Sequence, residues 1–148
     1  LVVFHHQRGA VQIEGELKAQ SLFGTMRCSI EDIAAGRVTL SLPFRQEVSQ
    51  QHGFFHGGAV GFLIDNATAA AAGAALRPGQ SLLTAEYKVN FLAPAAGERL
   101  ICRAEVVKAG ATITVVEARC FVAKDGQEKL CAIGLASMAV IAARPLAA

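Results

Sequence analysis

The amino-acid sequence predicts an α+β fold in which an antiparallel sheet curls around one long helix. A continuous apolar segment, residues 57–76, has the length of a buried helix, and the segments on both sides alternate apolar and polar residues as strands do. The chain has 148 residues, the size of one domain with one core. We therefore expect residues 1–148 to form a single domain.

The amino-acid composition excludes some classes of protein. Hydrophobic residues make up 53% of the chain and charged residues 18%, with a net charge of +2, which argues against disorder and against charge-driven binding of nucleic acid. The apolar content exceeds what a small monomer needs, so we expect a homo-oligomer. The first residues lack the features of a secretory signal, so a cytoplasmic location is expected.

The N-terminal third is expected to contain one hairpin. Residues 1–23 are interpreted as an extension or a short, weakly patterned helix. Apolar and polar residues alternate over 25–30, and after residues 32–36 the alternation resumes over 38–42. The two alternating segments predict a pair of antiparallel strands.

The predicted helix follows the hairpin and is rich in alanine, which allows a sheet to approach closely. It ends at Arg77-Pro78-Gly79, a combination that stops helices. Asp65 and Asn66 lie at its centre, where burial in lipid would be expensive. We therefore expect no membrane-spanning helix.

Four strand segments follow the helix and predict a four-stranded antiparallel meander, over 84–91, 99–106, 112–122 and 130–141. In the first segment, the alternation places Tyr87 and Phe91 on one face and Thr84 on the other. The last two segments are apolar on both faces, so we expect them at the centre of the sheet or at a contact between subunits.

The four cysteines form no short Cys-x-x-Cys pair and have no histidines at metal-binding spacing; they are at positions 28, 102, 120 and 131. They are interpreted as small core residues. No metal is predicted.

Asp65 is the only charged residue of the predicted helix. An unpaired carboxylate among apolar neighbours is strongly destabilising, so something must compensate it. Asp65 is therefore a candidate catalytic carboxylate. Two structural alternatives remain: a hydroxyl or amide neighbour satisfies it, or it faces solvent in a gap between subunits.

Gly57 and Gly58, preceded by His56, mark the expected start of the helix. Open backbone N–H groups and the helix dipole at this end suit an oxyanion hole, and the alternative is a plain entry turn. Gly57 and Asp65 are eight residues apart, or roughly 12 Å along one helix. Either one of them is irrelevant to catalysis, or the site joins Gly57 of one subunit to Asp65 of a second across a two-fold axis.

Three segments together carry a family resemblance: QQHGFFHGG at 50–58, LID at 63–65 and LTAEYKVNFLAPAAG at 83–97. With this joint spacing the chain resembles, from about Gly24 to Ala139, the hotdog-fold acyl-CoA thioesterases of the phenylacetate-pathway (PaaI-like) family. The resemblance implies a hotdog fold and a homodimer, often paired again into a homotetramer. It implies hydrolysis of acyl-coenzyme A without a cofactor, since coenzyme A is part of the substrate.

The resemblance also implies roles for particular residues. Asp65 matches the family's catalytic carboxylate, as general base or nucleophile, and the Gly57 N–H matches the donor to the thioester carbonyl. Gln50 matches a position that orients water or the carbonyl, and Thr84 a position that supports the carboxylate by hydrogen bonding. The glycine and Gln50 are expected to face Asp65 of the partner subunit.

Further residues are expected to contact substrate: His56, Gly58, Gln51, Phe54 and Phe91. Gln51 and His52 would take the role of Gln50 if the alignment slips by one residue. Where the family often has Arg or Lys after a turn glycine, Ala111 follows Gly110, so Lys108, Arg99 and Arg103 are candidate contacts for the coenzyme A phosphates.

Two other functions remain open at the level of sequence. One is a hydratase or dehydratase of acyl thioesters on the same fold, in which His56 or His52 would pair with Asp65. The other is a non-catalytic module that binds acyl-CoA.

Overall fold

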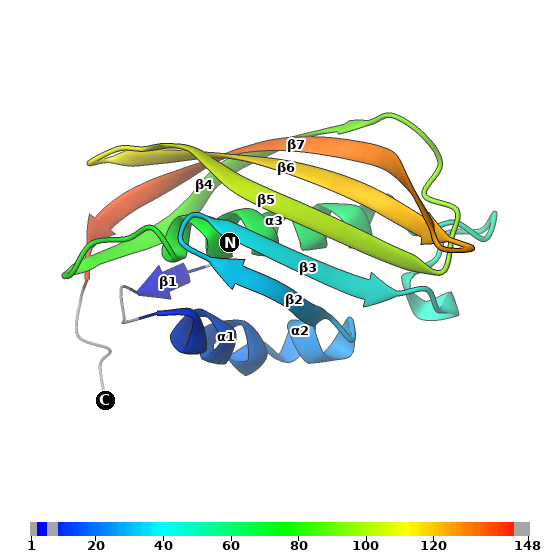
Figure 1. The fold of residues 1–148 in the computed structure, drawn as a ribbon, viewed down its shortest axis with the longest axis horizontal. Coiled ribbons are helices and arrows are strands. Elements are labelled where there is room, and N and C mark those ends of the chain that lie inside the picture. Colours follow the sequence, from blue (N-terminus) through cyan, green and yellow to red (C-terminus); the bar gives the residue numbers. More distant parts are fainter. Residues whose placement is uncertain (1–2, 6–8, 144–148) are drawn as a thin grey trace.

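The computed structural model describes residues 3–5 and 9–143. Seven strands form one antiparallel sheet in the order β1-β4-β7-β6-β5-β3-β2, and the sheet curves over the helix α3 (Figure 1). The α+β prediction is therefore confirmed. The strands are β1 Val3–His5, β2 Ser29–Ala34, β3 Arg37–Pro43, β4 Gln80–Phe91, β5 Arg99–Ala109, β6 Ile113–Lys124 and β7 Gln127–Ala142.

Three α-helices and one short 3₁₀ turn accompany the sheet: α1 Ala10–Ala19, α2 Ser21–Thr25, α3 Gly57–Gly73 and η1 Gln46–Val48. Ile13 and Leu17 of α1 are buried, and α1 packs against α3 and β2. Within the described part of the chain, no helix has both the length and the apolar character needed to cross a bilayer.

The first strand of the hairpin begins later than the alternation predicted. Residues 21–25 form α2 instead, and the turn after it is closed by a hydrogen bond from the Cys28 N–H to the Phe23 carbonyl. The strand then runs to Ala34 and not to Ile30, because an irregularity between Ile30 and Asp32 interrupts the alternation without ending the pairing.

The predicted meander of four strands is wrong in its first member. β4 pairs with β7 rather than with β5, and β5 pairs with β3 of the hairpin. The alternation of residues identifies the faces of a strand but not its neighbours, so it could not reveal this order. The expectation that the last two segments lie centrally is confirmed, since β7 and β6 are the third and fourth strands of seven.

Helix α3 is the centre of the core, and its apolar residues are buried on most of its circumference. It ends at Gly73, three residues before the predicted end, because the next residues form single turns that precede Pro78. The sheet approaches it closely: a Cβ atom on Gly134 of β7 would lie 2.8 Å from Cγ2 of Ile64.

One edge of the sheet is largely uncovered. β1 pairs only with residues 81–83 of β4, so that residues 84–91 of β4 have β7 on one side and no strand on the other among the described residues. Residues 85–88 of this stretch are exposed. A sheet edge of this length is a template for pairing with another strand.

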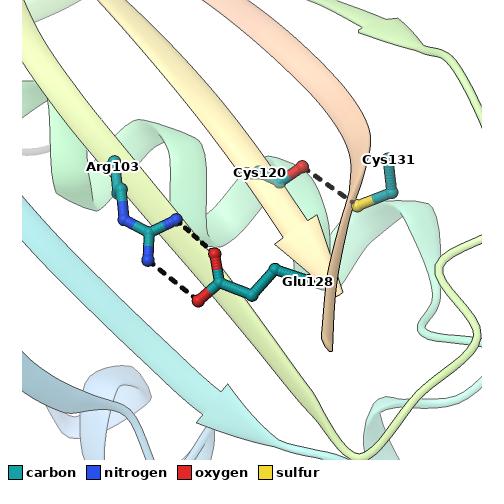
Figure 2. Close-up of polar contacts among 4 residues, drawn as sticks. All are labelled: Arg103, Cys120, Glu128 and Cys131. Carbon is teal, nitrogen blue, oxygen red and sulfur yellow. Dashed lines mark hydrogen bonds and ion pairs between the residues drawn. The ribbon is translucent and has the colours of Figure 1, made fainter. Parts of the chain in front are cut away.

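The cysteines behave as core residues. Cys102, Cys120 and Cys131 are buried and Cys28 is half-buried, and all four are free thiols. The Cys131 Sγ donates to the Cys120 carbonyl at 3.3 Å (Figure 2). Burial raises the pKa of Cys131 to about 11, which keeps its thiol protonated at neutral pH.

Candidate active site

Asp65 lies on α3 and is held by the edge strand β4. Its Oδ1 accepts a hydrogen bond of 2.8 Å from the Thr84 hydroxyl, and the carboxylate is half-buried. A hydroxyl neighbour, one of the two structural alternatives for Asp65, is therefore present. This contact holds Oδ1 of Asp65 against β4 and so fixes the orientation of the carboxylate.

A β-bulge places Thr84 on the helix side of β4. Regular alternation predicted Thr84 on the face opposite Tyr87, and this was wrong, because the pairing with β7 shifts register between Thr84 and Glu86. Thr84 and Tyr87 therefore both face α3, although regular alternation would place residues three positions apart on opposite faces of the strand.

Three residues of α3 spaced four apart form a stripe toward β4: Gly57, Gly61 and Asp65. A Cβ on Gly57 would lie 3.3 Å from Cζ of Phe91, and a Cβ on Gly61 would lie 3.3 Å from the Tyr87 hydroxyl. The two glycines therefore let aromatic side chains of β4 approach the helix backbone. Sequence reasoning missed Tyr87, although the four-residue spacing was a usable signal.

His56 is the N-cap of α3. Its Nδ1 accepts the Gly58 N–H at 2.8 Å, and its carbonyl accepts the N–H groups of Ala59 and Val60. The side chain is thus bound to the backbone of its own helix. A Cβ on Gly58 would lie 2.9 Å from this Nδ1, so a larger residue there would displace the imidazole from its capping position.

The capping pattern leaves one open donor at the helix start. Among the described residues, no acceptor lies on the N–H of Gly57, whereas those of Gly58, Ala59 and Val60 all have one. The helix dipole adds partial positive charge at this position. The Gly57 N–H is therefore the donor that an approaching carbonyl oxygen would meet.

A pocket of about 510 Å³ opens beside Gly57. No charged side chain occurs among its lining residues, which are Gln50, Phe54, Phe55, Gly57, Val60, Phe91, Leu92, Ala93, Pro94, Ala95 and Cys131. The predicted contacts Phe54 and Phe91 both belong to it. Such a lining suits an apolar group whose carbonyl lies at the helix start.

Gln50 lines this pocket and closes a tight turn. Its Oε1 accepts the His52 N–H, and the backbone of the turn is held by Gln50 N–H to Phe54 O at 2.9 Å. With Oε1 engaged, the side-chain NH₂ is the group that Gln50 can offer to a ligand. Gln51 is exposed and borders a different hollow, so the structure brings Gln50 rather than Gln51 to Gly57.

The two halves of the site do not meet within one chain. Gly57 and Asp65 lie on the same helix, roughly 12 Å apart along its axis, and His56 lies one residue further away. The same separation prevents His56 from pairing with Asp65 of its own chain, as the hydratase alternative would need.

Two of the three candidate contacts for coenzyme A phosphates already have acidic partners. Arg103 binds Glu128 through two hydrogen bonds, and Arg99 lies 3.3 Å from Glu31. Lys108 is exposed and has no acidic partner among the described residues. No cluster of three or more His, Cys, Asp or Glu side chains suited to a metal occurs in that same part of the chain.

An antiparallel sheet wrapped around one central helix is the hotdog fold. Residues 52–129 match the thioesterase superfamily, and the chain belongs to it. The protein is a thioester hydrolase of that superfamily, as the resemblance implied.

Known relatives agree with this placement. A thioesterase family protein from Silicibacter pomeroyi is 37% identical, with a TM-score of 0.86 over 88% of this chain and 96% of that one. A "Putative esterase" of Saccharolobus solfataricus is 29% identical over 79% of this chain and 82% of its own length. The E. coli PaaI protein from the phenylacetic acid degradation operon shares the fold, at 19% identity and a TM-score of 0.77 over 86% of this chain and 89% of that one.

Proposed function

We propose that the protein is an acyl-CoA thioesterase that releases a free acid and coenzyme A at a site shared by two copies of the chain. The open N–H of Gly57, beside an uncharged pocket, is the observation that carries the proposal. It supplies a fixed donor where negative charge develops on a thioester carbonyl.

The second copy supplies the carboxylate. Pairing of β4 with β4 of a second copy about a two-fold axis covers the open edge at residues 84–91. The paired strands run antiparallel, so the two α3 helices also run antiparallel, with the N-terminus of one beside the middle of the other. Asp65 of the partner subunit then lies near Gly57, which the 12 Å separation on one helix does not allow.

The chemistry follows from these positions. The carbonyl oxygen accepts from the Gly57 N–H, and the Gln50 NH₂ helps to orient it. Asp65 of the partner subunit takes a proton from water while the water oxygen bonds to the carbonyl carbon. The tetrahedral intermediate then re-forms the carbonyl and breaks the C–S bond, and coenzyme A leaves as a thiolate that takes up a proton.

The pocket indicates which acyl groups are accepted. Because no charged side chain lines it, burial of an acyl chain that ends in a carboxylate would be costly. Phe54, Phe55 and Phe91 offer apolar contact to hydrocarbon or aryl groups. We therefore infer a neutral acyl or aryl substrate.

The test is release of free thiol from a panel of short, medium, long, aryl and ω-carboxyl acyl-CoAs, with enoyl-CoA hydration followed separately. We expect hydrolysis of neutral thioesters and much slower hydrolysis of ω-carboxyl ones. Tight binding of acyl-CoA without turnover would favour a binding module, and hydration of enoyl-CoA without thiol release would favour a hydratase.

A further inference from the structure

The pocket beside Gly57 has an outer and an inner part. The residues of its outer part are at least partly exposed, and Phe91 and Leu92 at the end of β4 are the most open large side chains among them. Four lining residues are buried and form the inner part: Phe55, Val60, Ala95 and Cys131. A group that enters beside Gly57 and extends inward therefore ends against these four side chains.

A β-bulge in β7 brings Cys131 into the inner part of the pocket. In the pairing of β7 with β6, the register shifts between Cys120 and Phe121, and Cys131 is the inserted residue. Cys131 and the following Ala132 are both buried, although consecutive residues of a regular strand point to opposite faces. The bulge therefore turns Cys131 to the helix side of the sheet, where the pocket lies.

The backbone of Cys131 holds another wall of the same pocket. Its carbonyl oxygen accepts the N–H groups of Leu92 and Ala93, at 2.9 and 3.3 Å, and so ties the segment after β4 to the bulge. Both of these residues line the pocket. Because the two bonds use the main chain, a change of the Cys131 side chain keeps them and alters chiefly the space inside the pocket.

The side chain of Cys131 is small, uncharged and held in place. Its Sγ donates to the Cys120 carbonyl on the neighbouring strand at 3.3 Å (Figure 2). Burial raises the pKa of this thiol to about 11, so it stays neutral at pH 7 and adds no charge to the pocket. Since the surrounding core is close-packed, atoms added to this side chain would extend into the pocket.

The other three buried residues lie nearer to the entrance. Phe55 and Ala95 are joined by a hydrogen bond of 3.0 Å from the Phe55 N–H to the Ala95 carbonyl, and each directly follows a residue of the outer part. Val60 is on α3, three residues after Gly57, so an acyl group of any length would pass it. Cys131 lies across the pocket from the helix, on the sheet.

We propose that Cys131 is a specificity-determining residue that limits the length of the acyl group. The inference rests on the proposed function, because it concerns the same pocket and the same substrate. With the thioester carbonyl at the Gly57 N–H, the acyl chain runs past Val60 and ends at the bulge of β7. Cysteine is intermediate in size between alanine and leucine, so the depth of the pocket can be changed in both directions at this position.

The test is the chain-length profile of hydrolysis, measured as kcat/KM for straight-chain acyl-CoAs of increasing length. Relative to the shortest substrate, Cys131→Leu should lower kcat/KM about tenfold or more for the longest chain that the unmodified protein uses well. Cys131→Ala should extend hydrolysis to longer chains. Cys131→Ser keeps the size and the donor to Cys120, so it should keep the profile of the unmodified protein.

Cys28→Leu is the matched control, since Cys28 packs against the core and does not line the pocket. It should leave the profile unchanged. If Cys131→Leu folds poorly by circular dichroism, Cys131→Val adds less volume at the same site and should cause a smaller shift toward short chains. An unchanged profile in the alanine variant and in the folded larger variant would overturn the proposal. An equal shift in Cys131→Ser would also overturn it, because the effect would then not depend on size.

A second measurement separates this inference from the proposed function. Binding of straight-chain fatty acids, followed by calorimetry, needs the pocket but neither coenzyme A nor catalysis. If the unmodified protein hydrolyses no acyl-CoA, the proposed function fails, and the binding preference should still shift to shorter acids in Cys131→Leu and to longer ones in Cys131→Ala. Normal hydrolysis with unshifted preferences in both measurements would overturn the role of Cys131 alone. Neither hydrolysis nor binding at any chain length would overturn both.

Discussion

The Thr84 hydroxyl donates a hydrogen bond of 2.8 Å to Oδ1 of Asp65 and so joins the edge strand to the middle of the central helix. The contact depends on a β-bulge that turns Thr84 toward the helix. It fixes the orientation of the proposed catalytic carboxylate at the edge where a second copy would pair.

The first prediction concerns this contact. Thr84→Val keeps the shape of the side chain and removes the donor, so kcat should fall about tenfold with a smaller change in KM. Thr84→Ser retains the hydroxyl and should keep most of the activity. Equal steady-state parameters for the valine and serine variants would show that the hydrogen bond does not serve the reaction.

The second prediction isolates one N–H group. Proline is well tolerated at the first position of a helix, and His56 has the extended backbone, φ −64° and ψ 140°, that a following proline requires. Gly57→Pro therefore removes the proposed oxyanion donor with little change in the helix, and kcat should fall about 10²- to 10³-fold.

Gly57→Ala is the matched control, because it adds a Cβ at the same place and keeps the N–H. Its Cβ would contact only the end of the exposed Phe91 ring at 3.3 Å, which can move. Comparable losses in both variants would assign the effect to crowding and not to the missing donor.

The third prediction concerns the cap of α3. His56→Ala removes the acceptor for the Gly58 N–H and should lower the free energy of unfolding by about 1 kcal/mol in urea titrations. His56→Asn offers another capping oxygen and should restore most of the loss. A stability unchanged by the alanine substitution would mean that the cap is not effective in solution.

The fourth prediction is a pH dependence. The hydrogen bonds from Arg103 hold the pKa of the Glu128 carboxyl below its ordinary value. Because the pKa of Glu128 is lower in the folded than in the unfolded protein, its ionised form stabilises the fold at pH values above the pKa of the unfolded chain. This stabilisation is lost as the pH falls through the pKa of the folded protein.

Glu128→Gln should therefore lower stability at pH 7 by less than about 1 kcal/mol, since the pair is partly exposed. In strong acid, where Glu128 is protonated in both states, the variant and the unmodified protein should have the same free energy of unfolding. Glu98→Gln, at an exposed residue without an ion pair among the described residues, should show no such trend; an equal trend there would argue against the assignment to this pair.

Much of this fold could be predicted from local pattern. The apolar run at residues 57–76 contains helix α3, and alternation located β3 to β7 within a few residues. The order of strands could not be predicted, because alternation describes two faces and carries no information on which strand pairs with β4. The split of the N-terminal helix at Gln20 had no strong signal either.

The site was predictable in part. The eight-residue spacing of Gly57 and Asp65 along one helix already implies that both can serve one reaction only if a second subunit completes the site. The bulge at Thr84 could not be foreseen, since it changes the face of a residue without changing the pattern of residue types. The capping role of His56 was accessible in principle, because the residue directly precedes the helix start.

The shared site is tested most directly by mixing two inactive variants. Asp65→Asn should lower turnover about 10²- to 10⁴-fold, and Gly57→Pro removes the opposite half of the site. If each site joins Gly57 of one copy to Asp65 of the other, co-refolding equal amounts should restore about a quarter of the parent activity, because half of the dimers are mixed and each contains one intact site. Activity that stays at the level of the separate variants, in particles shown to be mixed, would contradict the account.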